Sequence, residues 1–234
     1  MHRGLRVTLV IPCLNEERGI RLVLGRVPPL VDETVVVDNG STDGTARVAR
    51  ELGATVVEEP RRGYGRALKS GFDRVETGII VTLDGDGTYP CECIGPMVDA
   101  LLDGPYDFLS GRRFTVTHEL SLSKLQRYCG NLTLTAVFGL LFGRCLRDSQ
   151  SGMWAFHRRA LEGMRLGSDG MAFSEEIKIE AFSRDGLRAG EYPIPYSHSA
   201  RRGRSKLRLW RDGLGNLSYL FRKKREMRRR RPGD

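Results

Sequence analysis

Ile79-Ile80-Val81-Thr82-Leu83-Asp84-Gly85-Asp86-Gly87-Thr88-Tyr89-Pro90 is the stretch that decides the fold. The apolar run from Ile79 to Leu83 is typical of a buried strand in a parallel sheet. The run ends abruptly at Asp84 and Asp86, which one glycine separates. Open α/β sheets bind ligands at the carboxyl ends of their strands. The pattern therefore predicts two carboxylates at a binding edge.

These two carboxylates suggest a metal site. Hard oxygen ligands suit Mg²⁺ or Mn²⁺, which proteins commonly hold through one or two carboxylates plus substrate phosphates. We therefore interpret Asp84 and Asp86 as ligands of a metal-bridged diphosphate, with Gly85 and Gly87 letting the ligand approach the backbone. The competing interpretation is a solvated acidic turn, because Asp and Gly are also common turn residues.

The N-terminal half alternates between strand and helix patterns. Strands are expected at 6–11, 34–37, 55–58 and 79–83. Helices are expected at 16–26, between the second and third strands with an end at Leu52, and at 65–75. We expect Pro12 and Asn15 to end the first strand and Asn15 to cap the first helix. This alternation predicts an α/β fold with a mostly parallel central sheet flanked by helices.

Polar side chains follow three of these four strands. The clusters are Asn15/Glu16, Asp38/Asn39 and Asp84/Asp86. Because parallel strands end at the same edge of a sheet, the clusters are expected to converge on one cleft, which weakens the acidic-turn interpretation. The fingerprints GxGxxG and GxxxxGK[ST] are absent, which disfavours NAD enzymes and P-loop NTPases.

The second half has a looser pattern. Helices are expected at 92–102, 122–141 and 173–182, with a short strand at 107–110 and an extended edge segment at 190–196. Arg112 and Arg113, directly after the short strand, are interpreted either as phosphate ligands or as a solvated turn. Ser174 is a candidate cap for the 173–182 helix. Glu175 and Glu176 either serve the first turn of that helix or project into the cleft as a catalytic base.

Composition narrows the function classes. The 234 residues fit one large domain better than two small ones. Much of the net charge of +9 comes from the end of the chain, at 222–225 and 228–231. After Leu207, apolar residues recur at helical spacing beside arginines, which predicts a basic amphipathic helix that attracts phosphates, anionic lipid or nucleic acid. No run reaches the roughly 18–20 apolar residues of a membrane span. Five scattered cysteines and the absence of a signal peptide favour a reduced, cytoplasmic protein.

Five segments resemble the motifs of a known family. Val10-Ile11-Pro12-Cys13-Leu14-Asn15-Glu16-Glu17, the stretch 37–45 and the stretch 84–90 are similar to successive motifs of family 2 glycosyltransferases. The stretches 148–152 and 202–207 resemble later motifs of the dolichyl-phosphate mannose or glucose synthase group. Each motif alone has modest specificity, and the five occur in the right order.

The resemblance implies a GT-A fold in residues 1–210, with a nucleotide-binding half of about 1–115 and an acceptor half of about 116–210, followed by a basic helix and tail at 211–234. It implies inverting transfer of a sugar from a UDP- or GDP-sugar to a polyprenyl phosphate, with Mg²⁺ or Mn²⁺. The implied nucleotide-sugar contacts are Pro12, Asn15, Glu16, Asp38, Asn39 and Asp84. The implied acceptor or phosphate contacts are Arg112, Arg113, Arg202, Ser205 and Lys206.

The catalytic residues expected are Asp84, Asp86, Arg112 and Glu176, with Asp84 and Asp86 holding the metal. The chain departs from the family pattern in two ways. Asn39 replaces the second of two adjacent aspartates that the family commonly has, and the C-terminal transmembrane helices of many members are not seen. We expect association with the inner face of the membrane through the basic C-terminus, with a membrane partner protein or a second copy as further possible partners.

Two other functions compete with this interpretation. A family 2 enzyme that glycosylates a soluble hydroxyl compound would need Glu175 or Glu176 as a base, because a hydroxyl must lose its proton. A non-catalytic nucleic-acid-binding protein would use the basic tail. That reading is disfavoured, because no aromatic stacking residues accompany the tail and the acidic cleft repels phosphate backbones.

Overall fold

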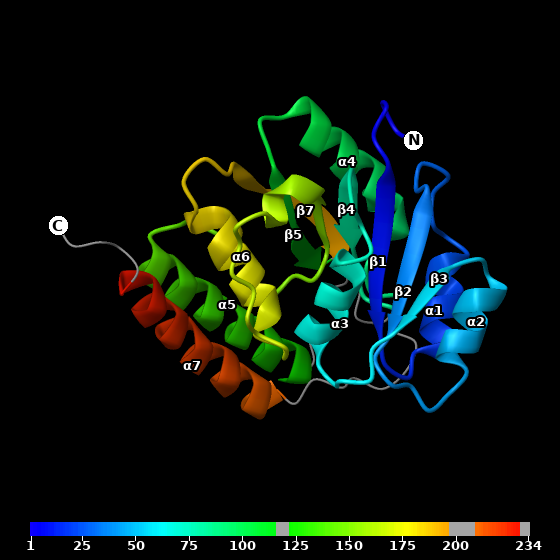
Figure 1. Cartoon of the computed structure of the whole chain (residues 1–234). Coiled ribbons are helices and arrows are strands. Elements are labelled where there is room, and N and C mark those ends of the chain that lie inside the picture. Colours follow the sequence, from blue (N-terminus) through cyan, green and yellow to red (C-terminus); the bar gives the residue numbers. More distant parts are fainter. Residues whose placement is uncertain (116–121, 197–208, 230–234) are drawn as a thin grey trace.

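The computed structural model describes residues 1–115, 122–196 and 209–229 (Figure 1). Seven strands form one sheet in the order β3-β2-β1-β4-β6-β5-β7. The strands are β1 (Val7–Cys13), β2 (Glu33–Asp38), β3 (Thr55–Glu58), β4 (Ile79–Thr82), β5 (Phe108–Thr115), β6 (Trp154–His157) and β7 (Ala189–Tyr196). All neighbours pair in parallel except β6, which is antiparallel to β4 and β5. The predicted mostly parallel sheet is confirmed.

Helices cover both faces of this sheet (Figure 1). They are α1 (Glu17–Leu24), α2 (Thr45–Glu51), α3 (Tyr64–Phe72), α4 (Ile94–Asp103), α5 (Leu122–Phe142), α6 (Phe173–Ser183) and α7 (Leu209–Arg228). Short 3₁₀ segments lie at Cys91–Cys93 and Arg158–Leu161. One apolar cluster joins α1, α2 and α4 to one face, and a second joins α3 and α6 to the other.

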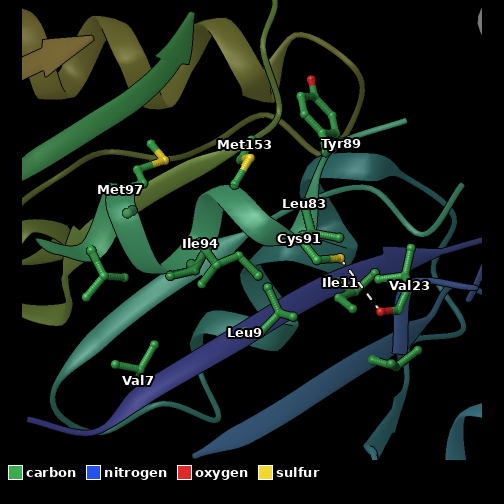
Figure 2. Packing of buried hydrophobic residues seen from close by; sticks show 14 of the residues in the cluster. Val7, Leu9, Ile11, Val23, Leu83, Tyr89, Cys91, Ile94, Met97 and Met153 are labelled. Atoms are coloured by element: carbon green, nitrogen blue, oxygen red, sulfur yellow. Dashed lines mark hydrogen bonds between the residues drawn. The ribbon is translucent and has the colours of Figure 1, made fainter. Parts of the chain in front are cut away.

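Alternation along β1 explains the two-sided core. Val7, Leu9 and Ile11 point to the face covered by α1 and α4, where they pack near Ile94 (Figure 2). Val10 points to the opposite face, against α3. Successive side chains of a strand point to opposite faces, so a strand with helices on both sides must be apolar throughout.

The last helix packs onto this three-layer body. Leu134 and Phe138 of α5 share a cluster with Tyr219 and Leu220 of α7, on the outer side of α6. Lys223 of α7 is only 1% exposed, and its Nζ lies 3.1 Å from Glu176 and 2.6 Å from Glu180. The stretch expected as a basic helix and tail thus joins the body through α7. Among the helices described, none is both long enough and apolar enough to cross a membrane.

Two strands are longer than predicted. Pro12 does not end β1 but lies inside it, opposite Val37 of β2. β1 pairs with β4 only as far as Val10. Cys13 O accepts a hydrogen bond on the β2 side, so the nitrogen of Pro12 faces the opposite side, beyond the end of β4. The N–H that proline lacks is therefore not needed for pairing between strands. β5 continues to Thr115 because β7 pairs with it along its whole length. Arg112 and Arg113 therefore lie in a strand, not after one.

Both predicted helix caps are wrong. α1 begins after Glu16, which takes the N-cap position predicted for Asn15. Instead Asn15 adopts a φ of 52°, and its Oδ1 accepts a 2.7 Å hydrogen bond from Thr42 N. Ser174 lies within the first turn of α6, where its Oγ donates to Met171 O at 3.1 Å. In both cases the side chain satisfies a nearby loop rather than the helix N-terminus.

Candidate active site

The aspartates after β4 lie in a tight turn. Asp86 is only 3% exposed, and its Oδ1 accepts hydrogen bonds from Thr88 N at 2.9 Å and Thr88 Oγ1 at 2.7 Å. Gly85 has a packing role: a Cβ there would lie 2.5 Å from Cys13 Sγ at the end of β1. Cys13 thus occupies the space that a side chain at this position would need, so packing alone requires a glycine here, and the approach of a ligand to its backbone stays a prediction.

Asp84 is held by a residue that sequence reasoning missed. Tyr64, the first residue of α3, donates its hydroxyl to Asp84 Oδ1 at 3.2 Å. Burial and the charge of Asp84 raise the pKa of Tyr64 well above its ordinary value, so the phenol remains a donor. Gly152 closes the other side, since a Cβ there would lie 2.6 Å from the Tyr64 hydroxyl and 3.3 Å from Asp84 Oδ1. The only local signal was an aromatic residue between Gly63 and Gly65.

We expect Tyr64→Phe to raise the metal concentration needed for half-maximal turnover by about tenfold, because groups that orient metal ligands typically contribute 10- to 100-fold to metal affinity. Gly152→Ala should do the same by displacing the Tyr64 hydroxyl. The two effects should be less than additive in the double variant, because both act on one contact. Metal titrations of turnover on all four proteins check this, and full additivity would contradict the shared contact.

Buried side chains hold the stretch 148–152 in place through hydrogen bonds to its backbone. Gly152 N donates to the Tyr89 hydroxyl at 2.8 Å, and Thr82 Oγ1 donates to Gly152 O at 2.8 Å. Lys178 of α6, fully buried, donates from Nζ to Ser149 O and Ser151 O, both at 2.7 Å. Burial lowers the pKa of Lys178 to about 7, while the nearby carboxylates oppose that shift. These hydrogen bonds hold the stretch in place, with Gly152 next to Asp84.

Arg113 forms a bidentate ion pair with Asp148. Its Nε and Nη2 donate to the two carboxylate oxygens at 2.6 and 2.8 Å, and its backbone N donates at 3.1 Å. The guanidinium also lies over the Tyr196 ring, 5.1 Å from the centroid. Burial alone would raise the pKa of Asp148, but the charge and hydrogen bonds of Arg113 lower it to about 2. The predicted phosphate contact of Arg113 stays a prediction, and its guanidinium is occupied by Asp148.

Arg112 is placed differently. Neighbouring residues of a strand point to opposite faces, so Arg112 points away from the side where Arg113 meets Asp148. Its side chain is half-buried, and within the described ranges it makes no ion pair. A half-buried guanidinium of this kind is suited to bind a phosphate in a bidentate manner.

The ends of β1 and β2 are joined as predicted. Asn15 N donates to Ser41 Oγ at 2.9 Å, and Asp38 Oδ1 accepts from Ser41 N at 3.1 Å. Glu16 and Asp38 are 7% and 8% exposed. The structure thus brings Asn15, Glu16 and Asp38 to the same sheet edge as the two aspartates after β4. Their contacts with a nucleoside, and that of Pro12, stay predictions.

Asn39 uses its whole amide to shape the next loop. Its Nδ2 donates to Glu59 O at 2.9 Å and to Arg61 O at 2.7 Å, while its Oδ1 accepts from Gly63 N at 2.7 Å. An ionised aspartate has no donor for the two carbonyls. The departure from the family pattern at this position therefore has a structural reason, because the amide holds the segment that leads to Tyr64.

The two adjacent glutamates of α6 have different surroundings. Glu176 accepts from Gly167 N at 3.0 Å, Ser168 N at 2.7 Å and Lys223 Nζ at 3.1 Å. Burial would raise the pKa of Glu176, but a hydrogen bond with Tyr219, the two backbone amides and the charge of Lys223 lower it. These contacts give Glu176 a role in anchoring α7, and its catalytic role stays a prediction.

Glu175 lies under the 148–152 stretch. It is fully buried, accepts a hydrogen bond from Gln150 Nε2, and has one carboxylate oxygen without a hydrogen bond in the described structure. Burial raises the pKa of Glu175 to about 7, although the Gln150 bond and the charge of Lys178 oppose the shift. The predicted phosphate ligands Arg202, Ser205 and Lys206 lie outside the described residues.

The donor set fits a divalent ion of the predicted kind. Asp84 and Asp86 offer hard oxygen ligands from one turn, which suits Mg²⁺ or Mn²⁺ better than softer metals. Across residues 1–115, 122–196 and 209–229, no group of three or more His, Cys, Asp or Glu side chains is placed to hold a metal. A divalent ion here would therefore complete its coordination with diphosphate oxygens and water.

The fold, with its polar residues at the carboxyl ends of β1, β2 and β4, agrees with what comparison with known proteins shows. The model of glycosyl transferase family 2 matches residues 8–164, and the chain belongs to that family. A dolichyl-phosphate hexose transferase of Haloferax volcanii is 34% identical over 204 residues, which are 86% of each chain. The low-salt glycan biosynthesis hexosyltransferase Agl6 of the same organism is 33% identical over 223 residues, 92% of this chain. The chain spans 53% of the length of Agl6.

Solved structures confirm the GT-A fold. Glucosyl-3-phosphoglycerate synthase from Mycobacterium tuberculosis, in complex with Mn²⁺, UDP-glucose and phosphoglyceric acid, matches with a TM-score of 0.77 and 26% identity. The match covers 94% of this chain and 80% of that one. The chain is therefore a glycosyltransferase, and related structures of the same fold bind a nucleotide sugar together with a divalent metal.

Proposed function

We propose that the protein transfers a hexose, with inversion, from a UDP- or GDP-sugar to a polyprenyl phosphate, and that the reaction needs Mg²⁺ or Mn²⁺. The observation that carries this proposal is the similarity to the dolichyl-phosphate hexose transferase, which extends over 86% of both chains. The site supports it, because two carboxylates and a half-buried arginine lie at the edge of the sheet where a diphosphate and a second phosphate would meet.

The donor side is preorganised by the chain. A divalent ion on Asp84 and Asp86 would neutralise the diphosphate leaving group. Tyr64 orients the Asp84 carboxylate, and Thr88 orients that of Asp86. Groups held in place before reaction need no reorganisation as charge develops. The ends of β1 and β2, with Asn15, Glu16 and Asp38, would receive the nucleoside.

The acceptor side favours a phosphate over a hydroxyl. A phosphate is ionised near neutral pH, so the enzyme needs to position it but not to remove a proton. Glu176 is engaged by backbone amides and Lys223, and Glu175 is buried beneath Gln150. Arg112 would bind the acceptor phosphate, together with Arg202, Ser205 and Lys206. In-line attack then inverts the anomeric centre without a covalent intermediate.

A soluble acceptor is the second candidate function. The solved relative described above binds phosphoglyceric acid, which carries a hydroxyl group besides its anionic groups. If this chain glycosylates a hydroxyl, Glu175 is the base that the structure favours, because its pKa of about 7 suits proton transfer near neutral pH. Association with the inner face of the membrane belongs to the first candidate alone.

The test is donor turnover by the purified protein with Mg²⁺ or Mn²⁺. UDP-glucose, UDP-N-acetylglucosamine and GDP-mannose are offered separately, each with a short-chain polyprenyl phosphate, with phosphoglyceric acid, or alone. We expect release of nucleoside diphosphate only with the lipid phosphate, and unchanged dependence in Glu175→Gln. Turnover that requires phosphoglyceric acid and disappears in Glu175→Gln would support the soluble acceptor instead. No turnover of any donor by folded protein would overturn both candidates.

A further inference from the structure

Exposed apolar side chains gather on two neighbouring helices. The described residues include eight large hydrophobic side chains that are exposed, and half of them lie on α5 and α7. These four are Leu132 (48% exposed), Leu140 (86%), Leu214 (64%) and Phe221 (54%). A contiguous exposed apolar patch on a folded protein commonly marks an interaction surface.

The four exposed side chains lie away from the buried sides of this helix pair. α5 and α7 lie side by side (Figure 1), and Lys224 Nζ lies 5.5 Å from the centroid of the Phe142 ring. Leu214 and Phe221 are seven residues apart, so they lie on the same side of α7. The inward sides of the two helices are already buried through the cluster that includes Phe138 and Leu220. The outer side is therefore left without protein cover in the described structure.

The charges around this apolar patch are predominantly positive. The exposed arginines of α7 are Arg222, Arg225 and Arg228, and Arg229 directly follows the helix. The exposed arginines that follow α5 are Arg144 and Arg147. From residue 130 to the end of α5 there is no acidic residue, and on α7 from residue 213 onward Glu226 is the sole one. Lys223, in contrast, points inward to Glu176 and Glu180.

The exposed apolar side chains and the arginines together indicate which kind of partner binds this surface. An amphipathic surface with Leu and Phe bordered by arginines is typical of a helix that lies in the interface of an anionic bilayer. A second copy of the chain would bring two positively charged borders together, which opposes association. An anionic lipid surface instead pairs with the arginines and accepts the apolar side chains.

The patch is also connected to the candidate active site. Asn216, between Leu214 and Phe221 on α7, donates from Nδ2 to Gln150 Oε1 at 3.0 Å. Gln150 belongs to the stretch that presents Gly152 to Asp84. The inward side of α7 thus contacts the loop where sugar transfer is proposed, while its outward side carries Leu214 and Phe221.

We propose that the outer side of α5 and α7, defined by Leu132, Leu140, Leu214, Phe221, Arg225 and Arg228, is a bilayer-docking face. It inserts its leucines and phenylalanine among the acyl chains of an anionic leaflet while the arginines pair with lipid headgroups. This inference deepens the proposed function by naming the surface through which the enzyme reaches a lipid-linked acceptor. It assigns α5 a part in docking that its sequence, with few charges, does not suggest.

The test is co-sedimentation of the full chain with vesicles of phosphatidylcholine containing phosphatidylglycerol. Leu140→Gln/Phe221→Gln should lower vesicle affinity at least tenfold, because each removes an apolar side chain from the bilayer, while glutamine retains helix propensity. Leu52→Gln, which changes an exposed leucine following α2, is the matched control and should bind as the wild type does.

The electrostatic part has its own variants. Arg225→Ala/Arg228→Ala should lower affinity for anionic vesicles by roughly fivefold per arginine, and added salt should diminish this difference. Arg74→Ala, after α3, should have no effect beyond its small change in net charge. Residual binding at high salt should depend on the apolar residues.

The outcomes separate this inference from the proposed function. Wild-type binding that the Leu140/Phe221 variant retains would overturn the docking face, even if turnover with a water-soluble short-chain polyprenyl phosphate is normal. Docking without turnover of any donor would overturn the proposed function and leave the face intact. A wild-type dimer that vesicles do not dissociate and that the Leu140/Phe221 variant disrupts would identify a second copy as the occupant and overturn the proposal.

Discussion

Asp86→Asn should lower sugar transfer by about 10²–10³-fold while the protein stays folded, a loss typical of removing one group that stabilises charge in the transition state. The asparagine Oδ1 can still accept from Thr88 N and Thr88 Oγ1, so the turn that Asp86 forms is retained. What disappears is one negative charge. The described residues contain no group of three or more His, Cys, Asp or Glu side chains that could hold a metal. A divalent ion here would depend on Asp84 and Asp86, so losing one charge should weaken metal binding strongly.

Thr88→Val is the matched control for this prediction. It removes the hydroxyl that donates to Asp86 but leaves both carboxylates, so stability should fall by about 1 kcal/mol and turnover should change only a few-fold. Donor turnover, Mn²⁺ binding and thermal unfolding are measured on both variants and the wild type. If Asp86→Asn retains both turnover and Mn²⁺ affinity, then Asp86 is a turn residue and the metal assignment fails.

Asp148→Asn should destabilise the fold by about 3–5 kcal/mol, the usual effect of removing one partner from a buried ion pair. The Asp148 side chain is 2% exposed and that of Arg113 is 20% exposed. Three hydrogen bonds from Arg113 end on the Asp148 carboxylate. The variant leaves the Arg113 guanidinium in a largely buried place without its counter-charge. Denaturant unfolding, read from the midpoint at a constant slope, measures the change.

The effect of Asp148 should depend on pH in a defined direction. Its pKa in the folded state, about 2, lies below that of an unfolded aspartate, near 3.8. The stabilisation linked to its ionisation is therefore present above about pH 4 and is lost as pH falls through 2. By linkage, this shift corresponds to about 2 kcal/mol. The difference in unfolding free energy between wild type and Asp148→Asn should thus shrink between pH 5 and pH 2.

An exposed carboxylate provides the control for the buried pair. Asp103 pairs with Arg3 at the surface, and both side chains are well exposed. Asp103→Asn should therefore change the unfolding free energy little at any pH, because solvent screens exposed pairs. A pH-independent difference for Asp148→Asn, or an equal effect of Asp103→Asn, would contradict the assignment of a buried, ionised carboxylate to Asp148.

Patterns of neighbouring residues were sufficient to predict many of the strands. The apolar runs predicted the first four strands to within about two residues at either end, and Thr55–Glu58 matches β3 at both ends. Such runs are short-range signals, because a strand buried on both faces must be apolar throughout. β5 was predicted too short, since its second half contains Arg112 and Arg113. Pairing with β7, about 80 residues further along, sustains it.

The sequence alone determined the order of strands and helices, the placement of Asp84 and Asp86 at a strand end, and the basic character of the C-terminal helix. These features depend on local composition and on spacing within single elements. Tertiary structure alone decided that Tyr64 holds Asp84, that Arg113 is bound by Asp148, and that Lys223 fixes α7 to α6. The partners are 20, 35 and 47 residues apart. Charge and hydrogen-bonding type show that such side chains need partners when buried, but only the packing of distant elements selects which partner each one meets.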